Sequence, residues 1–243
     1  MYSAQKMDSN LILSIRLSPF CHRSASRHSR LQFEGLNMGQ AKQRATLKDH
    51  VSTYNFAAVA SAVRRLSVAA SSQLGSDCYM LSALAQELLK RDGVFAQLRA
   101  GYAGWRCGSG DSDVILHCPT GSIPPQCGVV YHVWLEIVDH IFDVTTFSLP
   151  QKARELDLLD GGSTTVDWHP DYLFVPKSTV SSVRDVVQKH AGLYFYERQS
   201  QVEHLIFGVA PDLDPEDVDA ALTLYQHQDM VVLGPNNINL RGT

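Results

Sequence analysis

A thiol, an imidazole and a carboxylate follow one another in the middle of this 243-residue chain. Cys78 opens a segment with helical character, His132 lies in a strand-like segment, and Asp143 lies in the strand expected next. A thiolate attacks a carbonyl carbon, an imidazole of near-neutral pKa accepts and returns the proton, and a carboxylate selects the imidazole tautomer. Residues of these three types, if they come together, could carry acyl chemistry through a thioester.

The candidate nucleophile opens the clearest helix in the sequence, over residues 76–93. Ser76 is expected to cap this helix, Asp77 suits the positive end of its dipole, and Gly93 ends it. Cys78 then falls in the first turn, on the apolar stripe that faces the core. Unpaired backbone N–H groups at a helix start stabilise a thiolate, although the charge of Asp77 opposes this effect. Taken alone, the position also fits a buried core cysteine.

His132 and Asp143 can act together only if they share one face of a β-hairpin. A two-residue turn at 139–140, which composition favours, would set them four residues apart along the ladder, about 13 Å. A turn at 138–139 makes them diagonal neighbours, within reach of two side chains that lean together. We therefore predict the turn at 138–139, or a bulge with the same alignment.

These residues also carry a resemblance to a known family. A helix-initial Cys78, a His-x-Trp-x-Glu strand beginning at His132 and an Asp-x-Thr motif beginning at Asp143 resemble the transglutaminase-like branch of the papain-like cysteine enzymes. The resemblance covers roughly residues 71–146. Arylamine N-acetyltransferases and bacterial peptide-maturing cysteine proteases share the same residue order. The chain has Val144 where the family usually has the proline of an Asp-Pro-Thr motif. Its interval from Cys78 to His132 is also longer than in compact members of the family.

The resemblance implies a papain/transglutaminase-like α+β fold, with N-terminal helices packed on an antiparallel sheet. It implies that Cys78 is the nucleophile, His132 the general base and acid, and Asp143 the group that orients the imidazole. The N–H of Cys78 and the side chain of Gln73 are oxyanion-hole candidates. The substrate-cleft candidates are Trp105, Trp134 and His169, although packing is the alternative for His169.

The resemblance favours a thiol protease or amidase. An acyl transferase of the transglutaminase or arylamine N-acetyltransferase type is the alternative within the class. A non-catalytic binding domain on the same scaffold is the alternative from another class. The expected substrate is a peptide, a protein or a small amide, and the oligomeric state is left open.

The periodicity predicts helices first and antiparallel strands afterwards, which favours an α+β fold. The predicted helices cover 51–70, 76–93 and 179–190, with a further helix opening at 214–216. The predicted strands cover 94–105, 114–118, 129–138, 141–147, 172–175, 193–197 and 230–233, and 202–207 has no clear pattern.

The composition fits one domain of ordinary globular character. Apolar residues make up 44% of the chain and charged residues 19%, with a formal net charge of −4. These values favour neither a nucleic-acid nor a membrane partner, and no apolar run approaches the ~18 residues of a transmembrane helix. Residues 1–37 are expected to be a disordered leader or to precede the true start. Residues 38–243 are expected to form a single domain of the transglutaminase-like type with a C-terminal extension from about residue 170.

Cysteine usage bears on compartment and metal binding. Five cysteines, an odd number, with no signal peptide before them favour a reducing cytoplasm, and the text from Met38 resembles the opening of bacterial cytosolic proteins. The residues Cys107, His117, Cys118 and Cys127 lack the close spacing of structural zinc ligands. No metal site and no cofactor are predicted.

Overall fold

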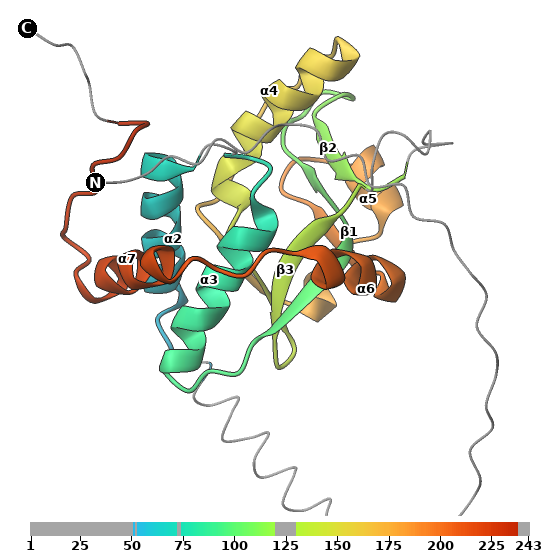
Figure 1. The fold of residues 1–243 in the computed structure, drawn as a ribbon. Coiled ribbons are helices and arrows are strands. Elements are labelled where there is room, and N and C mark those ends of the chain that lie inside the picture. The colour runs from blue at the N-terminus through green and yellow to red at the C-terminus, as the bar shows by residue number, and fades with distance from the viewer. Residues whose placement is uncertain (1–50, 52, 72–73, 120–129, 238–243) are drawn as a thin grey trace, which may run out of the picture.

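The computed structural model describes residues 51–237 except 52, 72–73 and 120–129. Figure 1 shows helices packed around a curved sheet, so the predicted α+β class with an antiparallel sheet is confirmed. The helices are α2 (Phe56–Ala70), α3 (Cys78–Arg91), α4 (Leu149–Asp160), α5 (Val183–Gln188), α6 (Ser200–Val209) and α7 (Pro215–Gln226). The strands are β1 (Gln97–Arg106), β2 (Val114–His117), β3 (His132–Ile137), β4 (His140–Asp143), β5 (Leu173–Pro176) and β6 (Tyr194–Arg198).

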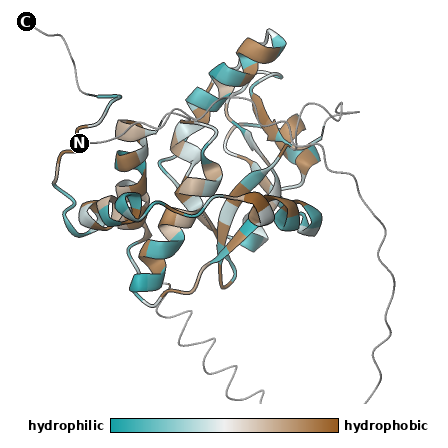
Figure 2. Ribbon diagram, viewed as in Figure 1, coloured by the Kyte–Doolittle hydropathy of each residue, from teal (hydrophilic) through white to brown (hydrophobic). Residues whose placement is uncertain are grey.

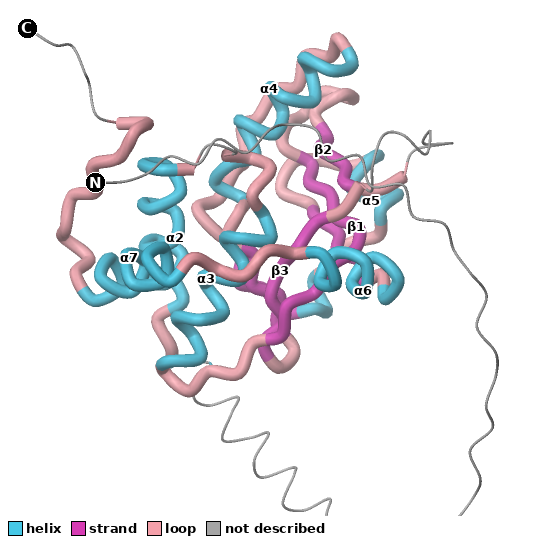
Figure 3. Tube along the Cα trace, in the orientation of Figure 1, coloured by secondary structure: helices cyan, strands magenta, loops and turns pink. Residues whose placement is uncertain are grey.

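The sheet is organised around the long strand β1. On one edge β1 pairs with β6, and on the other it pairs with β3 up to Gly101 and with β2 from Ala103 onward. Strands β4 and β5 continue the sheet beyond β3, and all these pairs are antiparallel. Figure 3 shows the strands surrounded by helices. Strands β5 and β6, which follow residue 170, thus belong to the same sheet as the strands before them.

The β3–β4 hairpin has the predicted register. Ile137 pairs with His140, so the two-residue turn is Val138-Asp139. Val138 has φ of +55°, a conformation that β-branched residues adopt only under strain. The alternation of side chains then places His132 and Asp143 on the same face of the sheet.

The main core lies between the sheet and three helices. Helix α3 packs on β3, and α2 and α7 pack against α3. Buried apolar side chains fill the space between them, among them Val59, Leu84, Leu88, Leu135, Phe142 and Leu224. In Figure 2 apolar residues run along the strands and along stripes of these helices. Burial of this surface anchors α3 and fixes where its first residue, Cys78, must lie.

The ends of α3 differ in part from the prediction. The N-cap is Asp77 rather than Ser76, and the Asp77 side chain makes no capping hydrogen bond. The hydroxyl of Ser76 donates instead to Glu155 of α4 at 3.1 Å. Gly93 follows the helix with φ of +73°, which fits its predicted role as a stop signal.

The predicted strand 141–147 ends at Asp143, and the predicted helices 51–70 and 179–190 are shorter, as Phe56–Ala70 and Val183–Gln188; three other segments differ in kind. Helix α4 was not expected, although Pro150 at its start and Gly161 in the left-handed region at its end are ordinary helix signals. Only one short stripe of α4 is buried, so its apolar residues recur only weakly at the spacing that predicts a helix. Helix α6 forms over the segment left without assignment. Residues 230–233 do not form a strand, because they pair with no strand in the described part of the chain.

Within the described ranges, no helix combines the length and apolar character needed to span a membrane. The predicted leader, residues 1–37, lies outside the described residues.

Candidate active site

The first turn of α3 meets the start of β3. The hydroxyl of Ser82 donates to the carbonyl of Val133 at 3.1 Å, and the backbone of Val133 helps to lower the pKa of the Cys78 thiol. Val133 and Cys78 also belong to one buried cluster, so the start of β3 lies against the first turns of α3. The Cys78 side chain packs with Ala100 and Val202, and the residue is 5% exposed.

The start of α3 has backbone donors without a side-chain cap. The Asp77 carboxylate accepts the hydroxyls of Ser67 at 3.1 Å and Ser71 at 2.7 Å. It makes no capping hydrogen bond to an N–H of the first turn. The N–H of Cys78, the predicted oxyanion donor, is one of the first-turn N–H groups that have no partner within the helix. The other predicted donor, Gln73, lies outside the described residues.

His132 and Asp143 form a fully buried pair. Nε2 of His132 lies 2.9 Å from Oδ2 of Asp143, and neither side chain is exposed. The other oxygen, Oδ1, accepts the N–H and the hydroxyl of Thr145, each at 2.8 Å. The hydroxyl of Tyr196 donates to Oδ2 at 2.7 Å. Four donors thus converge on one carboxylate, which fixes its orientation.

This arrangement fixes the tautomer of His132. The Asp143 carboxylate only accepts hydrogen bonds, so Nε2 of His132 carries a proton. Nδ1 has no hydrogen-bond partner among the described residues, and it is the nitrogen left for the interaction of the imidazole with the Cys78 thiol. Nδ1 is therefore the atom that can take a proton from the thiol.

The pKa values of the three groups are shifted in the directions that favour an ion pair. Burial alone would raise the pKa of the Cys78 thiol, but its interaction with His132 outweighs this and lowers the pKa. Burial alone would lower the pKa of His132, but the Asp143 carboxylate raises it. Burial opposes the charge of Asp143 as well, yet His132 and the other donors hold its pKa at about 2. The site favours thiolate, imidazolium and carboxylate together.

Two tryptophans enclose the imidazole. Trp105 meets the ring of His132 edge to face, with centroids 4.8 Å apart, and Trp134 stacks on the ring at 6.3 Å. Both tryptophans are buried, so the prediction that they line an open substrate cleft is wrong. They are core side chains that keep water from the imidazole. His169 is exposed and makes no ring contact or hydrogen bond with His132 among the described residues.

A buried lysine beside the thiol has no counterpart in the sequence prediction. Lys152 of α4 is 3% exposed, and its ammonium donates to the carbonyl of Gly75, three residues before Cys78. Its charge also lowers the pKa of the Cys78 thiol. Lysines on helices are usually solvated, so no sequence signal distinguishes Lys152 from the other lysines.

A second unforeseen neighbour is His117, which sequence analysis considered only as a zinc ligand. Its ring lies 5.9 Å from that of His132, and its Nδ1 lies 3.2 Å from the carbonyl of Tyr131. Burial holds the pKa of His117 well below its ordinary value, and the charge of Lys152 acts in the same direction. His117 is therefore neutral and adds no competing positive charge.

Replacing Lys152 by methionine is expected to slow alkylation of Cys78. Removal of the nearby ammonium raises the thiol pKa, so less thiolate is present at pH 6, and the rate with iodoacetamide falls about threefold or more. The same change at the exposed Lys189 is the matched control and leaves the rate unchanged. Equal rates for the Lys152 variant and the parent would show that the ammonium does not act on the thiol.

Acid is expected to destabilise the fold through Asp143. The pKa of this carboxyl is about 2 in the folded protein against an ordinary 3.8. Because folding lowers this pKa, the ionised carboxyl stabilises the fold at pH values above its ordinary pKa. That stability is lost as the pH falls from about 4 to 2. The shift corresponds to roughly 2 kcal/mol. Urea unfolding followed across this range measures the loss, and Asp143→Asn should remove that part of the pH dependence, whereas Asp171→Asn on the surface should retain it.

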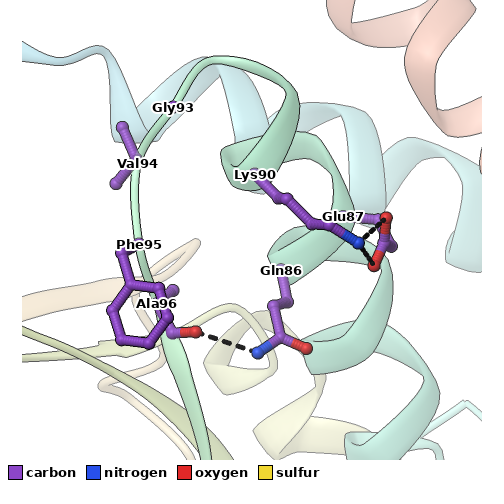
Figure 4. A pocket seen from close by; sticks show the side chains of 7 residues that line it. All are labelled: Gln86, Glu87, Lys90, Gly93, Val94, Phe95 and Ala96. Carbon is purple, nitrogen blue, oxygen red and sulfur yellow. Dashed lines mark hydrogen bonds and ion pairs between the residues drawn. The ribbon is translucent and has the colours of Figure 1, made fainter.

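A surface hollow lies at the far end of α3. Figure 4 shows it between the last turns of the helix and residues 93–96, with the amide of Gln86 donating to the carbonyl of Ala96 at 2.9 Å. A helix of 14 residues is about 20 Å long. This hollow is therefore separate from the thiol at the other end.

Neither a protein-family model nor a curated protein matches the sequence. A crystal structure from a genomics programme is similar over 75% of this chain and 80% of its own chain, with a TM-score of 0.48 and 13% identity. A likeness at this level carries no argument about function.

Proposed function

We propose that this chain is a cysteine enzyme of the transglutaminase-like fold that acts on amides through a thioester on Cys78, as a thiol protease or amidase. One observation carries the proposal. In the buried group of Cys78, His132 and Asp143, the carboxylate is held by four donors, while Nδ1 of the imidazole is left to the thiol. A core that needed only packing would gain nothing from burying three such groups together.

Acylation follows from this geometry. The thiolate of Cys78 forms a bond to the substrate carbonyl carbon, and the oxyanion that develops meets the N–H of Cys78. The carbon–nitrogen bond then breaks, and the leaving amine takes the proton from Nδ1 of His132. The products of this step are a thioester, a free amine and a neutral imidazole that still donates through Nε2 to Asp143.

Deacylation reverses these roles. Water attacks the thioester carbon while Nδ1 of His132 accepts one of its protons. The carbon–sulfur bond breaks, the carboxylic acid leaves, and the thiolate and the imidazolium are restored. Throughout both steps Asp143 stays ionised, because its role is to stabilise the imidazolium.

Acyl transfer is the second candidate, and the surroundings of the thiol favour it specifically. Cys78 is almost fully buried and packs with the half-buried rings of Tyr79, Tyr102 and Tyr131. Restricted access by water prolongs the life of a thioester and favours capture by another acceptor. A non-catalytic role for the scaffold is opposed by the four donors that hold Asp143 and by the buried imidazole nitrogen that is left to the thiol.

An activated ester tests the proposal without knowledge of the natural substrate. With p-nitrophenyl acetate we expect a burst of one equivalent of nitrophenolate and an acetyl group on Cys78, located by peptide mapping. Decay of this adduct in water supports a hydrolase, and faster decay with an added aromatic amine supports a transferase. Absence of the burst, or acetylation elsewhere with Cys78 unmodified, would rule out the thioester mechanism.

A further inference from the structure

The C-terminal part of the chain reaches the candidate active site through β6. Tyr196 lies opposite Ala103 of β1, on the face of the sheet that also carries Trp105. Its hydroxyl donates to Oδ2 of Asp143, the same oxygen that binds Nε2 of His132. Tyr196 is thus the one partner of this carboxylate that comes from outside the β3–β4 hairpin and the residues next to it, among the hydrogen bonds described.

The direction of this hydrogen bond is fixed by a third residue. The indole Nε1 of Trp105 lies 3.0 Å from the Tyr196 hydroxyl, and an indole N–H can only donate. The hydroxyl therefore accepts from Trp105, and its single proton is committed to Asp143. A hydroxyl that accepts one hydrogen bond is polarised and becomes a stronger donor. The hydrogen bond from Tyr196 to the Asp143 carboxylate is therefore strengthened.

We infer that Tyr196 is a positioning residue that acts on His132 through Asp143. Its hydroxyl holds Oδ2 of Asp143 against Nε2 of His132 and limits how strongly the carboxylate stabilises the imidazolium. The hydroxyl proton is the positive end of a dipole aimed at the oxygen that His132 binds. This proton offsets part of the negative charge on that oxygen, so the carboxylate stabilises the positive charge of the imidazolium less. An imidazolium that the carboxylate stabilises less gives its proton to a leaving group more readily.

The charged and titratable groups around His132 come from several elements. They are Cys78 of α3, His117 of β2, Asp143 of β4, Lys152 of α4 and Tyr196 of β6, with Tyr131 just before β3. Burial raises the pKa of Tyr196 well above its ordinary value and that of Tyr131 to about 12, so both stay neutral. Their protonation therefore does not change in the range where His132 titrates.

The inference rests on the proposed function, and a pair of alkylating reagents tests the two separately. Iodoacetate is anionic and is attracted by the imidazolium, whereas iodoacetamide is neutral. The ratio of their rates at Cys78 should fall with rising pH as His132 loses its proton, and its midpoint reports the pKa of that group. A parent protein without such a fall would lack the ion pair, which would contradict the proposed function itself.

In Tyr196→Phe we expect the midpoint to rise by at least about 0.3 pH unit, because the opposing dipole is gone. Tyr194→Phe, which removes an exposed hydroxyl from the same strand, is the matched control and should leave the midpoint in place. Trp105→Phe weakens the same donor and should raise the midpoint by a smaller amount.

If the Tyr196 variant folds and its midpoint is unchanged or falls, the inference is wrong. A loss of packing alone would loosen the ion pair and lower the midpoint. Should that variant fail to fold, an unchanged or lowered midpoint in Trp105→Phe would overturn it equally.

Discussion

Cys78→Ala is expected to abolish the nitrophenolate burst and all turnover, to below about one part in 10⁵ of the parent rate. The nucleophile is the one group to which the acyl carbon bonds, and the described neighbours of Cys78 offer no second thiol at the start of a helix. The variant should still fold, because the change removes a single sulfur atom from a site that already packs against small side chains such as Ala100.

The matched control for this variant is Cys107→Ala. Cys107 is also buried, but it lies in a different cluster, and burial raises the pKa of its thiol to about 12. Its replacement should leave the burst intact. If the Cys78 variant kept ordinary turnover on an ester or amide that the parent accepts, the thioester mechanism would be excluded.

His132→Ala is the second change with a large expected effect. Without the imidazole, the thiol loses both its base and the cation that lowers its pKa, so turnover should fall about as far as in the Cys78 variant. The deletion also leaves a space between the rings of Trp105 and Trp134. Free imidazole added to the solution is expected to enter this space and restore part of the activity, measured as the burst with p-nitrophenyl acetate.

The control is His190→Ala, on the exposed surface after α5. Its activity should equal that of the parent and should not respond to imidazole. Retention of the burst in the His132 variant without added imidazole would contradict the role of this residue. A folded variant, verified by its thermal unfolding, is needed for the comparison because His132 is fully buried.

The chemistry of the site predicted one feature of the fold better than local propensity did. Turn preferences favour Asp139-His140, whereas the observed turn puts Val138 at a positive φ. The requirement that His132 and Asp143 share a face selected the observed register. The strain at Val138 is tolerated because burial of the flanking strands determines the pairing.

The groups that tune the site could not be predicted from the sequence. Lys152 lies on a mostly polar helix with little apolar period, and Tyr196 lies 53 residues beyond Asp143. Their roles arise from tertiary contacts between elements far apart in the chain. Conversely, Trp105 and Trp134 are aromatic residues near the site, yet burial gives them a packing role that sequence alone does not distinguish from a substrate contact.

The rate at which each cysteine is alkylated tests the central claim most directly. Among the three cysteines that the structure describes, Cys118 is half-buried and Cys78 almost fully buried, so accessibility alone predicts that Cys118 reacts before Cys78. Burial raises the pKa of Cys118, whereas the environment of Cys78 lowers its pKa. Treatment with limiting iodoacetamide near neutral pH, followed by peptide mapping, should therefore label Cys78 first. Labelling of Cys118 with Cys78 spared would contradict the assignment of Cys78 as an activated nucleophile.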